Sequence, residues 1–255
     1  MDKNKLIKDR LDFYIKSSLK LFKQHPFPKL IQEEINQFND IIWIESQQIE
    51  IDAYKQEKKS ELNNLLNDKQ LHEGLETLFN DLTKIHTKEI QDNVELQLIE
   101  NLTKISFDLT EEKKDFKLNL LFLEHDYEPE ACFCGFDDED YTFKLLSGEE
   151  YLKYNYNKEL FNGAGRFDYS ALIYPILKFE EEIGEDKAFE IDQLFSAGGY
   201  LEDVKKLYLI NAYLGIHNCL DKIKGEFRNI RIPMRDNVHV FGNEHDCEQL
   251  NIYVI

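Results

Sequence analysis

The sequence contains little cysteine, little proline or glycine, and no long hydrophobic run. Four cysteines in 255 residues are too few for a disulfide-based fold, so we expect a reducing compartment, the cytoplasm. Five prolines and 11 glycines disfavour a loop-rich architecture. No stretch approaches the roughly 20 apolar residues that span a bilayer, and the charged, amphipathic start of the chain does not resemble a secretory signal. We therefore expect no membrane association.

Positive charge is also scarce. Lys and Arg total 31 against 50 Asp and Glu, which gives a net charge of −19. Residues 121–210 alone carry a net charge of −13. Such a surface repels phosphates, so nucleic-acid binding is disfavoured, and it attracts basic proteins. Acidity that serves only solubility is the alternative explanation.

Helical periodicity dominates the first half of the chain. Apolar residues recur at three- and four-residue spacing over residues 4–24 and 28–38, and again in three stripes over residues 53–105. The three stripes predict a helical subdomain of short antiparallel helices. Between the second expected helix and the first stripe, residues 41–51 are rich in isoleucine and favour a short strand pair.

Strand patterns appear in the second half. We expect strands at 118–123, 131–136, 238–241 and 250–255, and helices at 148–160, 169–183 and 200–223. The last helix is apolar nearly all round, which is typical of a buried central helix. Gly163-Ala164-Gly165-Arg166 fits no phosphate-binding pattern and predicts a flexible turn.

These elements predict an α+β fold with a mainly antiparallel sheet packed by helices and a helical N-terminal half. The helix at 200–223 would pack across the sheet. The predicted regions are residues 1–110, mainly helical, and residues 111–255, an α+β region that ends in a β-hairpin. The two can also form one integrated domain.

Two acidic runs are the candidate partner-binding residues: Asp137, Asp138, Glu139 and Asp140, and Glu180, Glu181 and Glu182. The first run does not match an EF-hand loop, because its sixth position is Thr142 and its twelfth is Gly148. A solvated acidic loop is one interpretation. An acidic edge that meets a basic partner is the other.

The segment from Glu124 to Glu128 is a third candidate. If the strand from Leu118 continues, Glu124, Asp126 and Glu128 share one face, because strand side chains alternate. Three carboxylates in line could hold Mg²⁺, Mn²⁺ or Ca²⁺, or supply an acid–base pair, with His125 beside them. The alternative is that the strand simply enters solvent before Pro129.

The cysteines and histidines lack the paired spacing that is typical of zinc sites. Cys132 and Cys134 would point to the same side of a strand, and His217 and Cys219 lie on the apolar helix. Structural roles are the favoured interpretation, with His217 as a core histidine. We expect no cofactor, and no hydrolase, zincin or kinase signature is present.

The resulting hypothesis is an acidic cytoplasmic protein-interaction module that binds a basic protein. In its concrete form it is an immunity protein that neutralises a basic toxin by occluding the toxin's cationic site, with an association that salt weakens. Two alternatives remain open. One is a metal-dependent hydrolase that uses Glu124, Asp126 and Glu128, and the other is a helical scaffold protein without a catalytic site.

Overall fold

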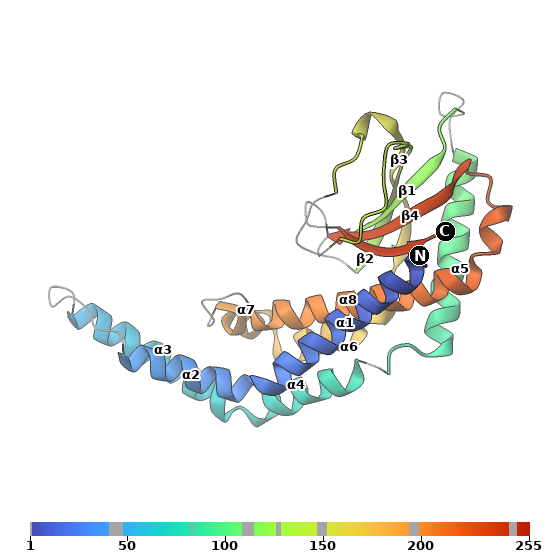
Figure 1. Cartoon of the computed structure of the whole chain (residues 1–255). Helices are drawn as coiled ribbons and strands as arrows, with labels where there is room; N and C mark the ends of the chain where they lie inside the picture. Colours follow the sequence, from blue (N-terminus) through green and yellow to red (C-terminus); the bar gives the residue numbers. More distant parts are fainter. Residues whose placement is uncertain are drawn as a thin grey trace. The chain divides into compact units, whose positions relative to one another are not determined.

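The structure is a computed structural model of the full chain. The structure describes residues 2–40, 48–82, 84–108, 115–125, 129–146, 152–193, 199–244 and 249–255. In these ranges the chain forms eight α-helices and a five-stranded sheet, so the expected α+β class is confirmed (Figure 1). No helix within these ranges combines the length and the apolar character that crossing a bilayer requires.

The helices follow the apolar periodicity of the sequence. They are α1 Lys3–Gln24, α2 Phe27–Asp40, α3 Gln48–Asn67, α4 Lys69–Asp81, α5 Lys88–Asp108, α6 Ser170–Ile183, α7 Glu185–Gln193 and α8 Tyr200–Ile223. Asp68 caps α4, because its side chain accepts a 2.9 Å hydrogen bond from Leu71 N. The prediction of a strand pair over 41–51 is wrong for residues 48–51, because these residues begin α3. Residues 41–47 lie outside the described ranges.

The sheet is mixed rather than purely antiparallel. Its strands are β1 Leu118–His125, β2 Glu130–Phe136, β3 Glu159–Asp168, β4 Met234–Glu244 and β5 Leu250–Val254. They lie in the order β3-β2-β1-β4-β5, with three antiparallel pairings and one parallel pairing between β1 and β4. A parallel pair needs a long crossover, and the chain supplies one through α6, α7 and α8 before it returns as β4.

Strand β3 occupies a region where a helix and a turn were expected. The prediction of a helix over 148–160 is wrong for the described residues. Residues 152–155 are irregular, Tyr156–Lys158 form a 3-10 turn, and β3 begins at Glu159. The predicted turn is also wrong: Gly163 and Gly165 lie inside β3 with φ of 61° and 64°. Glycine tolerates this left-handed backbone, and the register shifts along the β2–β3 ladder show that the strand is bulged there.

The chain forms two compact units that each draw on several parts of the sequence. The sheet unit comprises Met1–Tyr14, Lys84–Tyr174 and Tyr208–Ile255. The helical unit comprises Ile15–Thr83 and Pro175–Leu207. The division of the chain near residue 110 stays a prediction.

One face of the sheet packs against the part of α8 that belongs to the sheet unit. The Tyr213 hydroxyl lies 2.9 Å from His125 Nε2 on β1, and His217 Nδ1 lies 2.7 Å from the backbone oxygen of Ile252 on β5. A Cβ on Gly242 of β4 would lie only 2.4 Å from the ring of Tyr213. Glycine at this position therefore permits the close approach of helix and strand.

The opposite face of the sheet carries an apolar cluster to which, among the described residues, irregular chain contributes the cover. Its buried members are Leu120, Phe122, Cys134, Phe136, Leu146, Leu152 and Phe241. Leu146 and Leu152 come from the irregular chain after β2, residues 137–146 and 152–155, which we call the covering segment. Side-chain oxygens of two residues at β5 fasten it: Asn251 accepts from Leu146 N at 2.8 Å, and Gln249 accepts from Leu152 N at 2.6 Å.

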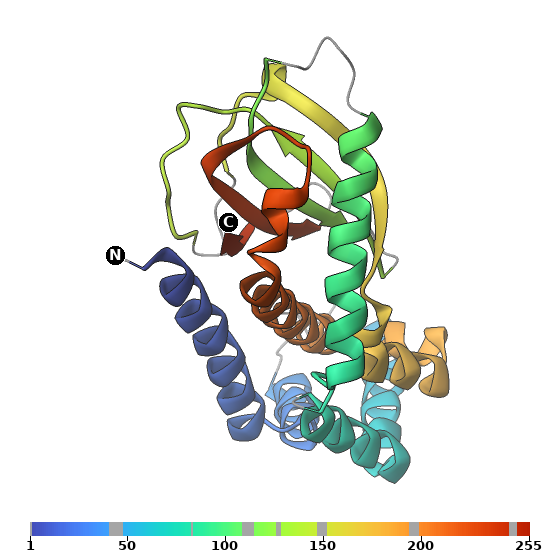
Figure 2. The same cartoon turned by 90° about the vertical axis from the view of Figure 1, so that its right-hand side faces the viewer.

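Side chains from helices bond to the backbone of both edge strands of the sheet. Helix α5 lies along the edge strand β3, as Figure 2 shows, and Gln97 Oε1 accepts a 2.8 Å hydrogen bond from Asp168 N. At the other edge, Asn4 of α1 donates to the backbone oxygen of Val254 at 2.8 Å and accepts from its backbone nitrogen at 2.7 Å. Backbone groups that are bonded in this way do not pair with a strand of another chain.

The helical unit has an aromatic core of its own. The ring of Tyr200 lies 4.9 Å from that of Phe27 and 5.4 Å from that of Phe22. Lys187 of α7 pairs with Asp68, the cap of α4, and its hydrogen bond lowers the pKa of that carboxyl. These contacts connect five helices: α1, α2 and α8 through the aromatic rings, and α4 and α7 through the ion pair.

Candidate functional site

The first acidic run begins the covering segment in the sheet unit. Asp137 is 5% and Asp138 9% exposed, whereas Glu139 and Asp140 are exposed. Arg235 on β4 donates from Nε to Asp137 Oδ1 at 2.7 Å, and its Nη2 lies 3.2 Å from Glu139 Oε2. The hydrogen bond to Asp137 raises the pKa of Arg235. Asp137 therefore serves as the counter-ion of an arginine in the same chain.

Asp138 holds the covering segment in place. Its carboxylate accepts a 3.1 Å hydrogen bond from Asn155 N, and its backbone nitrogen donates to Asn119 Oδ1 at 2.7 Å. The interpretation of residues 137–140 as a solvated loop is therefore wrong for Asp137 and Asp138. Of the four predicted contact residues in this run, Glu139 and Asp140 have side chains that a partner could reach, and their role as contacts stays a prediction.

The second acidic run ends α6 in the helical unit. Glu180 is half-buried and lies 2.7 Å from Lys205 Nζ on α8. Glu182 lies 3.4 Å from Lys178 one turn earlier, in an exposed pair. Glu181 is exposed and makes no ion pair with any residue that the structure describes. Such surface pairs contribute little stability, so these carboxylates remain available to another molecule.

Helix α7 follows α6 directly in the chain and adds further exposed acidic residues and an aromatic side chain. Residues 180–190 contain six acidic residues and one basic residue. Phe189 is 66% exposed, the most exposed of the large hydrophobic side chains in the described ranges. Glu185 and Asp186 in the first turn of α7 are exposed. We call Glu181, Glu182, Glu185, Asp186 and Phe189 the α7 surface.

Glu124 does meet potential metal ligands, but not those that were expected. The β1–β2 register places it directly opposite Cys132, and Cys134 lies two residues further along the same face of β2. Ligand atoms of these three residues all lie within 4.8 Å of one another. Asp126 and Glu128 lie outside the described residues, so the three-carboxylate site stays a prediction. His125 faces the other side of the sheet, where Tyr213 holds it.

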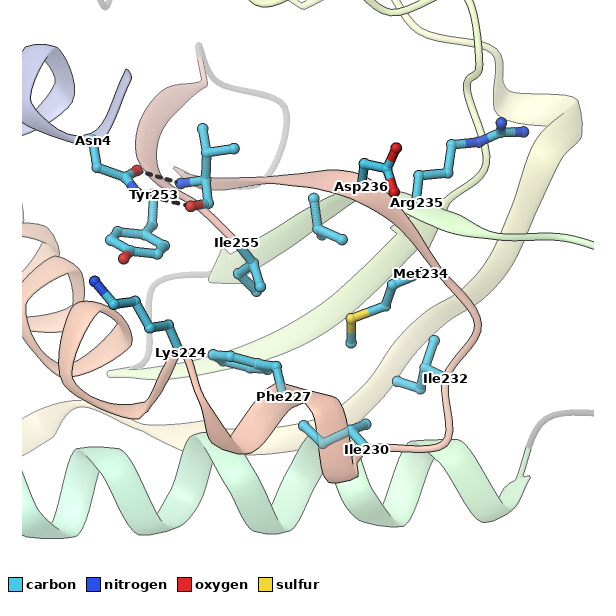
Figure 3. Close-up of a pocket in the computed structure, with 12 residues that line it drawn as sticks. Asn4, Lys224, Phe227, Ile230, Ile232, Met234, Arg235, Asp236, Tyr253 and Ile255 are labelled. Atoms are coloured by element: carbon cyan, nitrogen blue, oxygen red, sulfur yellow. Dashed lines mark hydrogen bonds between the residues drawn. The ribbon is translucent and has the colours of Figure 1, made fainter. Parts of the chain in front are cut away.

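A hollow of about 550 Å³ lies beside β4 and β5 in the sheet unit (Figure 3). Its apolar walls include Phe227, Ile230 and Ile232, which are 4%, 8% and 3% exposed. Because these side chains are already covered by their neighbours, little apolar surface remains for a ligand to bury. We assign no ligand to this hollow.

Two buried histidines of the sheet unit contribute to packing. His217 is 4% exposed and bonded to Ile252, as described above, and burial lowers its pKa. His239 on β4 is 5% exposed, and the centroid of its ring lies 4.8 Å from that of Tyr141 and 5.7 Å from that of Phe143. Burial lowers the pKa of His239 to about 4. The interpretation of His217 as a core histidine is confirmed.

No protein-family model, no curated protein and no solved structure matches this chain. The functional argument therefore rests on the geometry of the described residues. Two features stand out: the exposed acidic and aromatic side chains of the α7 surface, and the group formed by Glu124, Cys132 and Cys134.

Proposed function

We propose that this protein is an acidic protein-interaction module that binds a basic protein partner through the α7 surface. The observation that carries the proposal is Phe189, 66% exposed within a stretch of six acidic residues and one basic residue. Phe is enriched in the centres of protein interfaces, where a desolvated aromatic anchor with a polar rim contributes most of the affinity. An acidic rim selects a partner with a basic surface.

The net charge of −19 supports the same class of partner. A strongly acidic protein accelerates the approach of a cationic protein and repels nucleic acid and anionic lipid. Within the helical unit, Glu180 on α6 adds one more carboxylate beside Glu181 and Glu182 in the sequence, and Glu139 and Asp140 of the sheet unit stay separate predicted contacts. The specific form we propose is an immunity protein that covers the cationic active site of a toxin, such as a nuclease, inside the cell that produces it.

Matched charge reversals test the proposed surface. The full-length protein is immobilised and used to capture partners from lysate of the producing cells at low and at high salt. The test variant is Glu181→Lys/Glu182→Lys. The control is Glu76→Lys/Glu100→Lys, two exposed residues on α4 and α5 whose reversal changes the net charge equally. We expect a stoichiometric basic protein that high salt releases, that the control still binds, and that the test variant binds at least about tenfold more weakly.

A second comparison tests the aromatic anchor. Phe189→Ala should weaken the same complex by about tenfold or more, whereas Phe107→Ala, which removes an exposed phenyl ring from α5, should leave it unchanged. Equal binding by the wild-type protein, Glu181→Lys/Glu182→Lys and Phe189→Ala would overturn the assignment of this surface. If the captured partner is harmless when expressed alone, the interaction module stands and the immunity role does not.

A further inference from the structure

The carboxylate of Glu124 and the thiols of Cys132 and Cys134 converge on one face of the sheet. Cys134 Sγ lies 3.1 Å from Glu124 Oε2 and 3.0 Å from Asn162 Oδ1 on β3. Three adjacent strands thus contribute to the group, and strands hold side chains more rigidly than loops do. No residue of the α7 surface takes part, so the group is independent of the proposed function.

The surroundings of Cys134 are unusual for a thiol that only fills the core. Its side chain is buried, 3% exposed, and belongs to the apolar cluster with Phe122 and Phe136. One S–H can donate only one full hydrogen bond, yet two oxygen acceptors lie within 3.1 Å of the sulfur. The sulfur of Cys134 thus lies at the centre of a group of polar side-chain atoms from three strands.

The chemistry of the donors selects the class of cation. Two thiolate sulfurs and one carboxylate oxygen are ligands that zinc accepts, whereas Mg²⁺ and Ca²⁺ take oxygen ligands almost exclusively. Zinc binds sulfur at about 2.3 Å and carboxylate oxygen at about 2.0–2.2 Å, so tetrahedral ligands lie roughly 3.5–4 Å apart. The spread of up to 4.8 Å among the three ligand atoms requires only small side-chain adjustments. Glu124 and Cys132 are half-buried, which leaves a path for the ion.

We infer that Glu124, Cys132 and Cys134 form a binding site for one thiophilic divalent cation, with zinc as the natural occupant. The side-chain oxygen Oδ1 of Asn162 or a water molecule would be the fourth ligand of a tetrahedral site. Bound metal would join β1 to β2, and through Asn162 to β3, so it should raise the thermal stability of the sheet unit as well as occupy the ligands.

Metal titration of the reduced full-length protein tests the site. Zn²⁺ affinity is measured by competition with a chromophoric chelator, and Co²⁺ is added separately to record its absorption spectrum. We expect one equivalent of either metal, a thiolate-to-cobalt charge-transfer band, a higher melting temperature with Zn²⁺, and no effect of Mg²⁺. Failure to bind one equivalent of Zn²⁺, or a Co²⁺ spectrum without the thiolate band, would overturn the inference.

Variants locate the site within the chain. Cys134 lies in the core, so Cys134→Ser is at risk of misfolding. The test therefore relies on the half-buried ligands Cys132 and Glu124. Cys132→Ser and Glu124→Gln should each weaken Zn²⁺ binding by about 100-fold or more, with the apo-protein melting temperature recorded to show that the fold persists. Cys219→Ser, which replaces a buried thiol on α8, and Cys247→Ser should leave the affinity unchanged. Binding that survives Cys132→Ser but is lost in either control would place the metal elsewhere and refute the assignment.

Discussion

Asn101 on α5 and Arg166 on β3 exchange two hydrogen bonds. Asn101 Nδ2 donates to the backbone oxygen of Arg166 at 2.9 Å, and the backbone nitrogen of Arg166 donates to Asn101 Oδ1 at 3.0 Å. One turn earlier on the helix, Gln97 repeats the pattern with the backbone of Asp168. Two side-chain amides at i and i+4 thus replace the strand that would otherwise pair with this edge of the sheet.

Removing these amides should destabilise the protein and expose the edge. We expect Asn101→Ala to lower the free energy of unfolding by about 1–2 kcal/mol and Gln97→Ala/Asn101→Ala by about 2–3 kcal/mol, because backbone groups of β3 lose their partners. Urea denaturation measures both changes. Gln32→Ala, which removes an exposed amide bonded to Asn36 on α2, should change the free energy by less than about 0.5 kcal/mol. Equal losses in the control and in Asn101→Ala would contradict the edge-capping role.

The pairing of Arg235 with Asp137 gives a second prediction. In Arg235→Met, the carboxylate of Asp137 would remain 5% exposed without a cation, so we expect a loss of about 2–3 kcal/mol. The Arg235 side chain is one-third exposed, which keeps the loss below that of a fully buried pair. Glu139→Gln removes the exposed partner of the same arginine and should cost less than about 0.5 kcal/mol. Similar losses in both variants would show that Asp137 does not depend on the arginine.

Two glycines distinguish close packing from open space. A Cβ on Gly242 would meet the Tyr213 ring at 2.4 Å, and that ring is 4% exposed and tied to His125. Gly242→Ala should therefore lower the free energy of unfolding by about 1–3 kcal/mol. Gly225 has an ordinary φ of −70° and no atom within 4 Å of a Cβ, so Gly225→Ala should leave stability unchanged or raise it by up to about 1 kcal/mol. The measurement is the thermal unfolding of both variants. Equal stability of Gly242→Ala and Gly225→Ala would contradict the close approach of α8 to β4.

His239 should make the protein sensitive to acid. Burial, with a smaller contribution from the positive charge of Lys3, lowers its pKa from 6.5 to about 4. The unfolded chain takes up a proton near pH 6.5, while the folded chain does so only near pH 4. Stability is therefore independent of this group above pH 6.5 and is lost as the pH falls from 6.5 to 4, by on the order of 2–3 kcal/mol.

The measurement is the free energy of unfolding between pH 4 and pH 7.5. His239→Leu should flatten the decline, because the variant has no group to protonate at this position. His217, whose pKa burial also lowers, retains its own smaller contribution in both proteins. His25→Leu, in the connection between α1 and α2, serves as the matched histidine-to-leucine control. An unchanged slope in His239→Leu would exclude this histidine as the source.

Much of the fold could be predicted from local patterns. The helix over 200–223 was expected from its apolar residues alone and is found with the same bounds. The four strands at 118–123, 131–136, 238–241 and 250–255 were expected from alternation and turn residues, and all are present. β3 could not be found in this way, because Gly163 and Gly165 interrupt its alternation and a bulged strand looks like a turn in the sequence.

The candidate metal group shows why side-chain neighbours are harder to predict than elements. The sequence places Cys132 and Cys134 on one face of a strand and Glu124 on the preceding strand. Their meeting depends on the β1–β2 register, in which Glu124 faces Cys132. A slip of one residue would put Phe133 opposite Glu124 and turn both thiols to the other face of the sheet.

The sequence by itself determined the charge, the α+β class and most of the elements, because periodicity and turn chemistry act over a few residues. Tertiary structure alone decided which acidic residues are exposed. Asp137 and Asp138 are indistinguishable in the sequence from Glu139 and Asp140, yet Arg235 and Asn155 hold the first two in the interior. Burial of a carboxylate depends on a cation or an amide that comes from a distant part of the chain, and the fold brings that partner to it.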